Sequence, residues 1–273
     1  WIKYMEYHYP DQLDHLSSCK SPQQMFGALV KNYLPEKIGV PAKNICHISI
    51  MPCVAKKYEY NRPEMESENG RDVDIVLTTR EAAKLFKLRG INLATIPDAE
   101  FDKFMGEGSG AGRIFGTTGG VMEAALRTVV WKLTGGKVDQ IDYHTVRGYR
   151  GLKEATLTIG DMEVKVAIVN GIGNVRAVME DIRAGKSPYH FIEVMACPGG
   201  CLNGGGAPLT ASPDMVAERM EQIYESDRKN PVRRSHENEE VQSLYREYLG
   251  EPCGHLSHHL LHTTYVDRSG EVK

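Results

Sequence analysis

Cys197 and Cys201 stand in the segment CPGGCLNGGG (197–206), directly after the apolar stretch FIEVMA (191–196). Five of the ten residues in this segment are glycine, and glycine lets a backbone adopt positive φ and approach a bulky group closely. Thiolates are ligands for soft iron, zinc or an iron-sulfur cluster. The pattern predicts a metal or cluster site at a strand end, and the alternative is a tight turn with two incidental buried cysteines.

Cys53 lies in the segment MPC (51–53), which also follows a short apolar run. Its position at a second strand end allows three thiolates to converge, although a lone cysteine after a strand is more commonly a small core residue. Lys56 and Glu59 follow it. They are either solvated surface charges or, for Lys56, a hydrogen-bond donor to an anionic ligand.

Two other patterns point less strongly to chemistry. The loop GEGSGAGRIFGTTGG (106–120) has a loose likeness to a dinucleotide fingerprint, but the preceding AEFDKFM does not read as a strand. We therefore expect a loop around a compact cofactor. The helical spacing of four histidines near the C-terminus suits a zinc face, but we interpret them as a helix surface: His255, His258, His259 and His262.

The elements that must position these residues alternate between strand and helix, which predicts an α/β fold. Two capping boxes mark helix starts, one from Ser21 to Gln24 and one from Thr78 to Glu81. A β-hairpin is expected over 155–171 with its turn at Gly160. The other predicted elements are buried strands at 44–50, 73–79 and 191–196, and helices at 22–34, 81–90, 121–135, 174–185, 213–229 and 238–249.

Composition narrows the function further. The chain has 273 residues, 41% of them hydrophobic and 25% charged, with a net charge of -3. These values are typical of a globular protein with one large domain or two lobes, and no basic block indicates nucleic-acid binding. No apolar run approaches the ~20 residues that cross a bilayer, so membrane insertion is not expected. The six cysteines predict no disulfide framework, which indicates a reducing compartment, the cytoplasm. The charged stretch 227–240 is expected to be a solvated connection.

Four segments together resemble one known family. They are KSPQQMFG (20–27), MPCVAKKYE (51–59), IFGTTGGVMEAALRT (114–128) and FIEVMACPGGCLNGGGAP (191–208). On these residues the chain resembles the catalytic domain of the iron-only, or FeFe-type, hydrogenases over essentially its whole length. Trp1 matches the last residue of that family's first signature, so we expect an N-terminally truncated fragment without that signature's two cysteines.

The resemblance implies a cofactor and its ligands. Cys53, Cys197 and Cys201 would ligate a 4Fe-4S cluster, and Cys201 would also bridge it to a di-iron subcluster that bears carbonyl and cyanide ligands. Lys56 would donate to a cyanide. The family likeness assigns further residues to the same cavity and to proton transfer: Met51, Met195, Phe115, Pro22, Gln23 and Pro52 around the cofactor, Ser17 on the proton path, and Glu59 as a secondary polar candidate.

The implied function is reversible reduction of protons to molecular hydrogen. The implied fold is a two-lobed α/β domain (1–273) with mixed or parallel sheets flanked by helices and the cofactor in the cleft between lobes, including a small-subunit-like helical segment at about 213–273. Its expected partners are ferredoxin or NAD(P)H-linked electron-transfer subunits, and maturation proteins for the di-iron unit. The alternatives are a non-catalytic hydrogenase-like iron-sulfur protein for cluster assembly or sensing, and a zinc or electron-transfer module that uses only the three thiolates.

Overall fold

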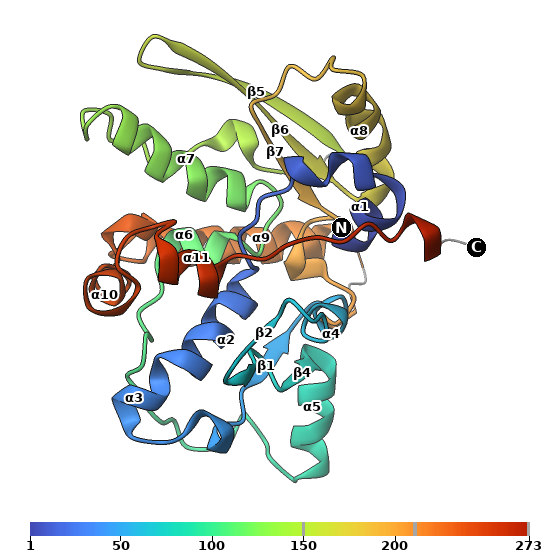
Figure 1. Cartoon of the computed structure of the whole chain (residues 1–273). Coiled ribbons are helices and arrows are strands. Elements are labelled where there is room, and N and C mark those ends of the chain that lie inside the picture. The colour runs from blue at the N-terminus through green and yellow to red at the C-terminus, as the bar shows by residue number, and fades with distance from the viewer. Residues whose placement is uncertain (149–150, 210–211, 272–273) are drawn as a thin grey trace. The chain divides into compact units, whose positions relative to one another are not determined.

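The structure is a computed structural model that describes residues 1–148, 151–209 and 212–271. These residues divide into two compact units (Figure 1). Unit 1 comprises Trp1, Phe101–Gly204 and Leu209–Gln242, and unit 2 comprises Ile2–Glu100, Gly205–Pro208 and Ser243–Lys273. Both units combine helices with a small sheet, so the predicted α/β class is confirmed.

Unit 1 contains a three-stranded mixed sheet in the order β5-β6-β7. β5 (Leu152–Ile159) and β6 (Met162–Asn170) form the predicted antiparallel hairpin, whose turn uses Gly160 at a φ of +59°. β7 (Phe191–Met195) pairs with β6 in parallel. Because β7 ends at Met195, the strand delivers the cysteine segment directly to the carboxyl edge of this sheet.

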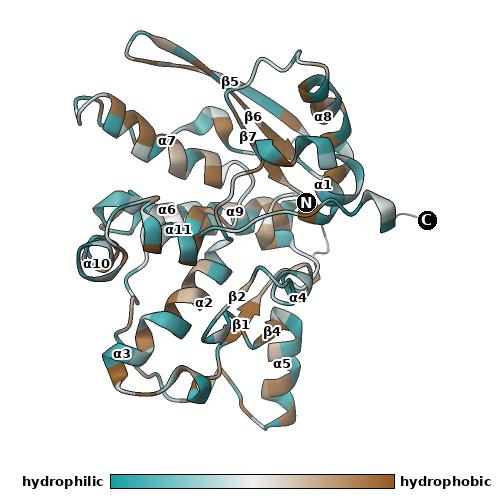
Figure 2. Ribbon diagram, viewed as in Figure 1, coloured by the Kyte–Doolittle hydropathy of each residue, from teal (hydrophilic) through white to brown (hydrophobic). Residues whose placement is uncertain are grey.

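Helices cover both faces of this sheet. The last five residues of β6, Val166 to Asn170, are all buried, which is typical of a strand enclosed on two sides. Figure 1 shows α7 (Gly120–Leu133) and α8 (Val175–Arg183) on either side of the strands, and β6 and β7 are hydrophobic along most of their length (Figure 2). The core between α7 and the sheet contains Met122, Leu126, Val130, Tyr143, Val146, Ile159, Val166 and Ile168.

A second core in unit 1 lies between three helices, α6 (Gly110–Ile114), α7 and α9 (Pro213–Arg228). The expected loop 106–120 therefore contains a short helix. The Ser109 hydroxyl accepts a hydrogen bond from the Gly112 N–H at 3.1 Å and caps this helix, which buries Ala111 and Ile114. The apolar pair at helical spacing outweighs the low helix propensity of the surrounding glycines.

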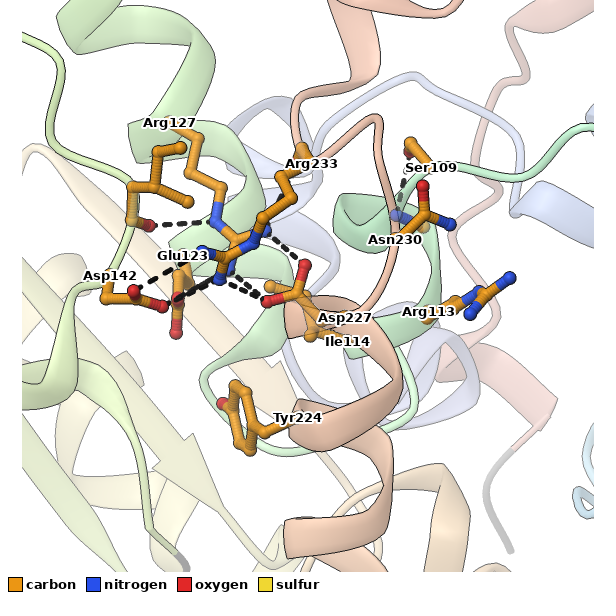
Figure 3. A network of polar contacts seen from close by, with 12 residues as sticks. Ser109, Arg113, Ile114, Glu123, Arg127, Asp142, Tyr224, Asp227, Asn230 and Arg233 are labelled. Carbon is orange, nitrogen blue, oxygen red and sulfur yellow. Dashed lines mark hydrogen bonds and ion pairs between the residues drawn. The ribbon is translucent and has the colours of Figure 1, made fainter.

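The prediction of a solvated connection at 227–240 is wrong, because buried ion pairs hold this segment (Figure 3). Arg127 on α7 is fully buried, and its guanidinium donates to both oxygens of Asp227 at 2.8 Å and to Glu123 at 2.8 Å. Arg233 also donates to Asp227, at 2.6 Å, and to Asp142, at 2.8 Å. Two of these pairs, Arg127 with Asp227 and Arg233 with Asp142, join residues that are 100 and 91 positions apart, so a local pattern does not reveal their burial.

Unit 2 is built around two parallel strands, β1 (Ile48–Met51) and β4 (Ile75–Thr78), with Ile48 opposite Ile75. The predicted capping box is confirmed at α5 (Thr79–Leu88), where Thr78 and Glu81 exchange backbone and side-chain hydrogen bonds. The prediction of buried strands is wrong for part of each strand, because Ile48 is 51% exposed and Ile75 41% exposed. Only one face of this two-stranded sheet is covered by the rest of the unit.

The helix α2 (Pro22–Asn32) begins at Pro22 as predicted, but the capping box proposed for it does not form. The Ser21 hydroxyl donates instead to Glu59 at 2.8 Å.

No helix in the described residues is long and apolar enough to cross a membrane. The remaining elements are α1 (Ile2–His8), α3 (Leu34–Ile38), α4 (Lys56–Glu59), α10 (Glu239–Leu244), α11 (His255–Leu261), β2 (Glu66–Ser67), β3 (Gly70–Arg71), a π-helix (Tyr245–Leu249) and 3-10 turns at Pro10–His15, Ala42–Asn44, His144–Val146, Ile172–Asn174, Cys201–Asn203, Ser235–Glu237 and Ser269–Glu271.

Candidate metal centre

The cysteine loop of unit 1 follows β7 without a break. Cys197 lies two residues after the strand, and Cys201 opens a 3-10 turn, Cys201–Asn203. The carbonyl of Cys197 accepts a hydrogen bond from the Gly200 N–H at 3.0 Å, and that of Cys201 accepts one from the Gly204 N–H at 2.9 Å. Both cysteines are half-buried, and neither forms a disulfide. The loop thus presents two sulfur atoms on a backbone that is fixed by its own hydrogen bonds.

Gly199 and Gly200 give this loop its shape. Their φ angles are +87° and +97°, a region that costs other residues strain. A Cβ atom on Gly200 would lie 2.7 Å from the Thr118 nitrogen. The backbones of the cysteine loop and of the turn before α7 are in direct contact at this point. The Thr118 N–H donates to the Gly199 carbonyl at 3.1 Å, and the Leu202 N–H donates to the Gly116 carbonyl at 2.9 Å. The glycines therefore permit a close approach between the cysteine loop and the turn before α7.

Cys53 belongs to unit 2 and follows Met51, the last residue of β1. The Pro52 carbonyl accepts a hydrogen bond from the Gly206 N–H at 2.9 Å, and a Cβ on Gly206 would lie 2.8 Å from the Thr78 side chain. The glycine run that begins after Cys201 thus contacts the Cys53 loop within unit 2. This contact explains why glycines continue beyond the second cysteine of the pair.

Lys56 is not a solvated surface charge. Its side chain is 21% exposed, and its ammonium group donates to the two carboxylate oxygens of Glu59 at 2.8 and 3.1 Å. Glu59 also accepts from the Ser21 hydroxyl. Because an ammonium group has three donors, Lys56 keeps the capacity to donate to a further acceptor while Glu59 orients it.

Gln23 carries a second nitrogen donor. Its side-chain oxygen accepts a hydrogen bond from the Ser49 hydroxyl at 2.6 Å, and the residue is 4% exposed. Its Nε2 atom is buried and has no hydrogen-bond partner within the described part of the chain. An unpaired buried donor costs roughly 1–3 kcal/mol, so this atom is suited to a ligand that accepts hydrogen bonds.

The remaining predicted residues are divided between the units. Met195, at the end of β7, and Phe115, the C-cap of α6, belong to unit 1 and are half-buried. Pro22 belongs to unit 2, at the start of α2. Ser17, also in unit 2, is exposed; its hydroxyl accepts from the Cys19 N–H at 3.3 Å, and its carbonyl from the Tyr265 hydroxyl at 2.5 Å.

The structure gathers Met51, Cys53, Lys56 and Gln23 within one unit and the pair of Cys197 and Cys201 within the other. No group of three or more His, Cys, Asp or Glu side chains that could hold a metal is found among the residues described in either unit. This includes the C-terminal histidines, of which His255, His258 and His259 are exposed. The convergence of three thiolates therefore stays a prediction.

Sequence reasoning missed two buried residues that support the cysteine loop. Asn170, the last residue of β6, accepts a hydrogen bond from the Gly199 N–H at 3.0 Å. Glu193, in β7, accepts from the N–H groups of Gly119 at 2.6 Å and Met122 at 2.7 Å. A signal for Glu193 was available, because a carboxylate in the middle of an apolar strand needs buried donors.

The residues present fit an iron-sulfur group with anionic ligands. Sulfur donors suit iron, glycines keep the loop backbone open to close approach, and the donors on Lys56 and Gln23 suit a bound anion. The fit is a matter of donor chemistry in each unit. It does not depend on the relation between the units.

Comparison with known proteins identifies two family matches. Residues 1–205 match the family described as iron only hydrogenase large subunit, C-terminal domain, and residues 213–268 match iron hydrogenase small subunit. NADP-reducing hydrogenase subunit HndD from Solidesulfovibrio fructosivorans is 46% identical to the chain, over 98% of this chain and 46% of that protein. The chain spans about half the length of the hydrogenases it matches.

A solved structure and a second type of relative complete the comparison. A variant of FeFe-hydrogenase HydA1 from Chlamydomonas reinhardtii has a TM-score of 0.84 and 42% identity, covering 98% of this chain and 74% of that one. Cytosolic Fe-S cluster assembly factor narfl from Xenopus tropicalis is 34% identical over 97% of this chain and 57% of that protein. Both hydrogenases and cluster assembly proteins are thus similar to the chain.

Proposed function

We propose, because this chain belongs to the iron-only hydrogenase family, that it forms the cofactor-binding part of an enzyme that reversibly reduces protons to molecular hydrogen. Family membership supports a role in hydrogen metabolism in general. The observation that carries the specific proposal is the pair of nitrogen donors, Lys56 Nζ and Gln23 Nε2, in the unit that holds Cys53. A charged donor such as Lys56 Nζ and a second nitrogen donor suit anionic ligands that accept hydrogen bonds, and cyanide is such a ligand.

Three thiolates would hold the group. Cys53, Cys197 and Cys201 would ligate the 4Fe-4S cluster, with Cys201 as the bridge to a di-iron subcluster carrying carbonyl and cyanide. When bound, this group supplies electron transfer and the hydrogen chemistry, which belongs to the cofactor rather than to the side chains. The chain's own contributions are ligation by soft sulfur, hydrogen bonding from Lys56 and Gln23, and apolar packing by Met51 and Met195.

We further propose that residues 1–273 act as one catalytic domain with a small-subunit-like segment at about 213–273. Its electron partner would be ferredoxin or an NAD(P)H-linked subunit, and maturation proteins would supply the di-iron unit. The match to the small-subunit family and the name of the NADP-reducing relative support this choice. Curated relatives include proteins named as cytosolic and as periplasmic, and we propose the cytoplasm because none of the six cysteines forms a disulfide.

Infrared spectroscopy tests the function against its alternative. The full-length protein that contains this chain, produced with the maturation proteins, is expected to show bands of metal-bound carbonyl and cyanide and to evolve hydrogen from a reduced donor. A 4Fe-4S electron paramagnetic resonance signal without those bands would favour the cluster assembly or sensing role, which the similarity to narfl supports. Zinc as the sole bound metal would favour a thiolate module.

Lys56→Asn is expected to reduce retention of the di-iron unit by about tenfold or more, because the proposed cofactor site loses its charged donor. The measurement is the intensity of the carbonyl and cyanide bands per protein. Lys57→Asn is the matched control, since Lys57 lies on the same helix and pairs with Glu81 at the surface. If both variants retain the same amount of di-iron unit per protein, Lys56 has only a structural role, in its ion pair with Glu59.

Ser17→Ala is expected to lower hydrogen turnover per cofactor by about 10²-fold while the iron content stays normal, the scale of a lost proton-transfer group. The hydroxyl of Ser17 accepts one hydrogen bond and keeps its own proton available. Ser18→Ala is the control, because this neighbouring hydroxyl is hydrogen-bonded to His262 at 2.8 Å. Unchanged turnover in the Ser17 variant would remove this residue from the proton path.

A further inference from the structure

Glu193 is the one buried residue of β7, at 5% exposed, in a strand whose other members are Phe191, Ile192, Val194 and Met195. A buried carboxylate is expensive unless hydrogen-bond donors surround it. An apolar side chain in this position would avoid that cost. Packing alone therefore does not explain why the position holds a carboxylate.

The donors to Glu193 come from the start of α7. Its two carboxylate oxygens accept from the N–H groups of Gly119 and Met122 at 2.6 and 2.7 Å. Gly119 is the N-cap of this helix and has no side chain that could cap it. Glu193 therefore replaces the missing cap from a neighbouring strand, and the positive end of the helix dipole favours its charge.

The turn that Glu193 holds is the one that contacts the cysteine loop. Residues 116–119 lead into α7, and the Thr118 N–H and the Gly116 carbonyl pair with Gly199 and Leu202. Gly199 lies between the two cysteines and Leu202 directly follows Cys201, so the two contacts stand on either side of Gly200 and Cys201. Strand β7, the cysteine loop, the turn and the Glu193 carboxylate thus form a closed ring of contacts within unit 1.

The charge of Glu193 is balanced mainly by backbone groups. The pKa of Glu193 is raised, because the effect of burial outweighs that of the N–H groups of Gly119 and Met122, which act to lower it. The ammonium group of Lys153 lies near Gly119 and also acts to lower the pKa of Glu193 through its charge, but its hydrogen bonds go to the carbonyls of Val146 and Gly148, at 2.5 Å. The hydrogen-bond donors that satisfy the carboxylate therefore belong to the turn itself.

We propose that Glu193 is a positioning residue for the Cys197 and Cys201 thiolates, which it fixes by clamping the turn 116–122 against their loop. The inference deepens the proposed function and rests on it only in the identity of the bound group. The geometry of the apo loop is tested separately, because the clamp requires no metal.

Site-specific thiol labelling of the apo chain provides that test. In Glu193→Gln, one oxygen becomes an amide nitrogen that faces an N–H group, so one charge-assisted hydrogen bond is lost and replaced by repulsion. Alkylation of Cys197 and Cys201, followed by peptide mass spectrometry, is expected to be about tenfold faster than in the unmodified chain. The rate at Cys53, in unit 2, is expected to stay unchanged. Glu163→Gln, an exposed position on the neighbouring strand β6, is the matched control.

Two results would overturn the proposal. Unchanged labelling of Cys197 and Cys201 would show that the clamp does not control their loop. A parallel increase at Cys53 would show general destabilisation rather than positioning. Both readouts hold whether the protein binds a di-iron group, a 4Fe-4S cluster or zinc, so failure of the proposed function is recognised separately by infrared spectroscopy.

Glu193→Asp keeps the inference testable if the glutamine variant does not fold. Aspartate retains the charge but is one methylene shorter, so it is expected to rescue part of the effect, with labelling of Cys197 and Cys201 about threefold faster than in the unmodified chain. After reconstitution with iron and sulfide, loss of iron to a chelator is expected to follow the same order, slowest for glutamate and fastest for glutamine. Rates equal to the unmodified chain in both measurements would overturn the proposal.

Discussion

Cys201→Ser in the full-length protein is expected to abolish the carbonyl and cyanide bands and hydrogen evolution, a loss of at least about 10³-fold. Serine is nearly isosteric with cysteine, but its hard oxygen is a poor substitute for a thiolate that bridges soft irons. The 3-10 turn that carries Cys201 is fixed by backbone hydrogen bonds, so the fold of unit 1 is expected to persist. The measurement is infrared intensity per protein, together with iron content and thermal unfolding.

Cys46→Ser is the control for this experiment. Cys46 is an exposed free thiol, and no role at the metal centre is assigned to it, so its variant is expected to keep both bands and turnover. Retained bands with normal turnover in the Cys201 variant would refute its assignment as the bridging ligand. Loss of the bands with retention of a 4Fe-4S signal would place Cys201 at the di-iron unit specifically.

The parts of this fold that the sequence predicts are those in which local pattern and tertiary structure agree. The hairpin at Gly160 needs only a turn residue between two β-branched runs, and the capping box at Thr78 needs only a partner three residues later. The candidate centre was predicted on the same basis, since its cysteines directly follow apolar strands. Their roles as ligands stay predictions.

The parts that sequence does not predict depend on partners distant along the chain. Ser21 stands at the N-cap position of α2, but its hydroxyl donates a hydrogen bond to Glu59, 38 residues later. A local pattern contains no information on that competitor. Glu193 interrupts an apolar strand without any local partner, because its donors lie 74 and 71 residues away. Hydrophobic periodicity also does not indicate which face of β1 is left uncovered.

Arg127→Met is expected to lower the free energy of unfolding by about 3–5 kcal/mol, the cost of leaving buried charges without their partner. Arg127 and Asp227 face each other (Figure 3), are both fully buried and lie 100 residues apart. Arg127 also donates to the Ile141 carbonyl at 2.9 Å. Methionine fills part of the volume but donates no hydrogen bond. Denaturant unfolding of the full chain, followed by circular dichroism, measures the loss.

Arg228→Met is the matched control, because Arg228 follows Asp227 on α9 and its ion pair with Glu221 is exposed. Exposed pairs contribute about 0–1 kcal/mol, so this variant is expected to unfold nearly as the unmodified chain does. The double variant Arg127→Met with Asp227→Asn is expected to lose less than the sum of its single changes, since it removes both charges. Equal losses in Arg127→Met and Arg228→Met would show that the buried pair contributes no more than a surface pair.

The pH dependence of the stability of Arg127→Met tests whether the loss comes from the charge of Asp227. Burial raises the pKa of Asp227, but the hydrogen bonds from Arg127 and Arg233 outweigh it and hold that pKa below its ordinary value. A carboxylate with a depressed pKa stabilises the folded state above its unfolded pKa of about 3.9, and this stabilisation is lost as the pH falls through its folded pKa. Without Arg127, the pKa of Asp227 is expected to lie closer to its ordinary value. The difference in the free energy of unfolding between the unmodified chain and Arg127→Met is therefore expected to be full at neutral pH and to narrow below about pH 4. A difference that does not change with pH would assign the loss to the volume that methionine leaves unfilled rather than to the charges.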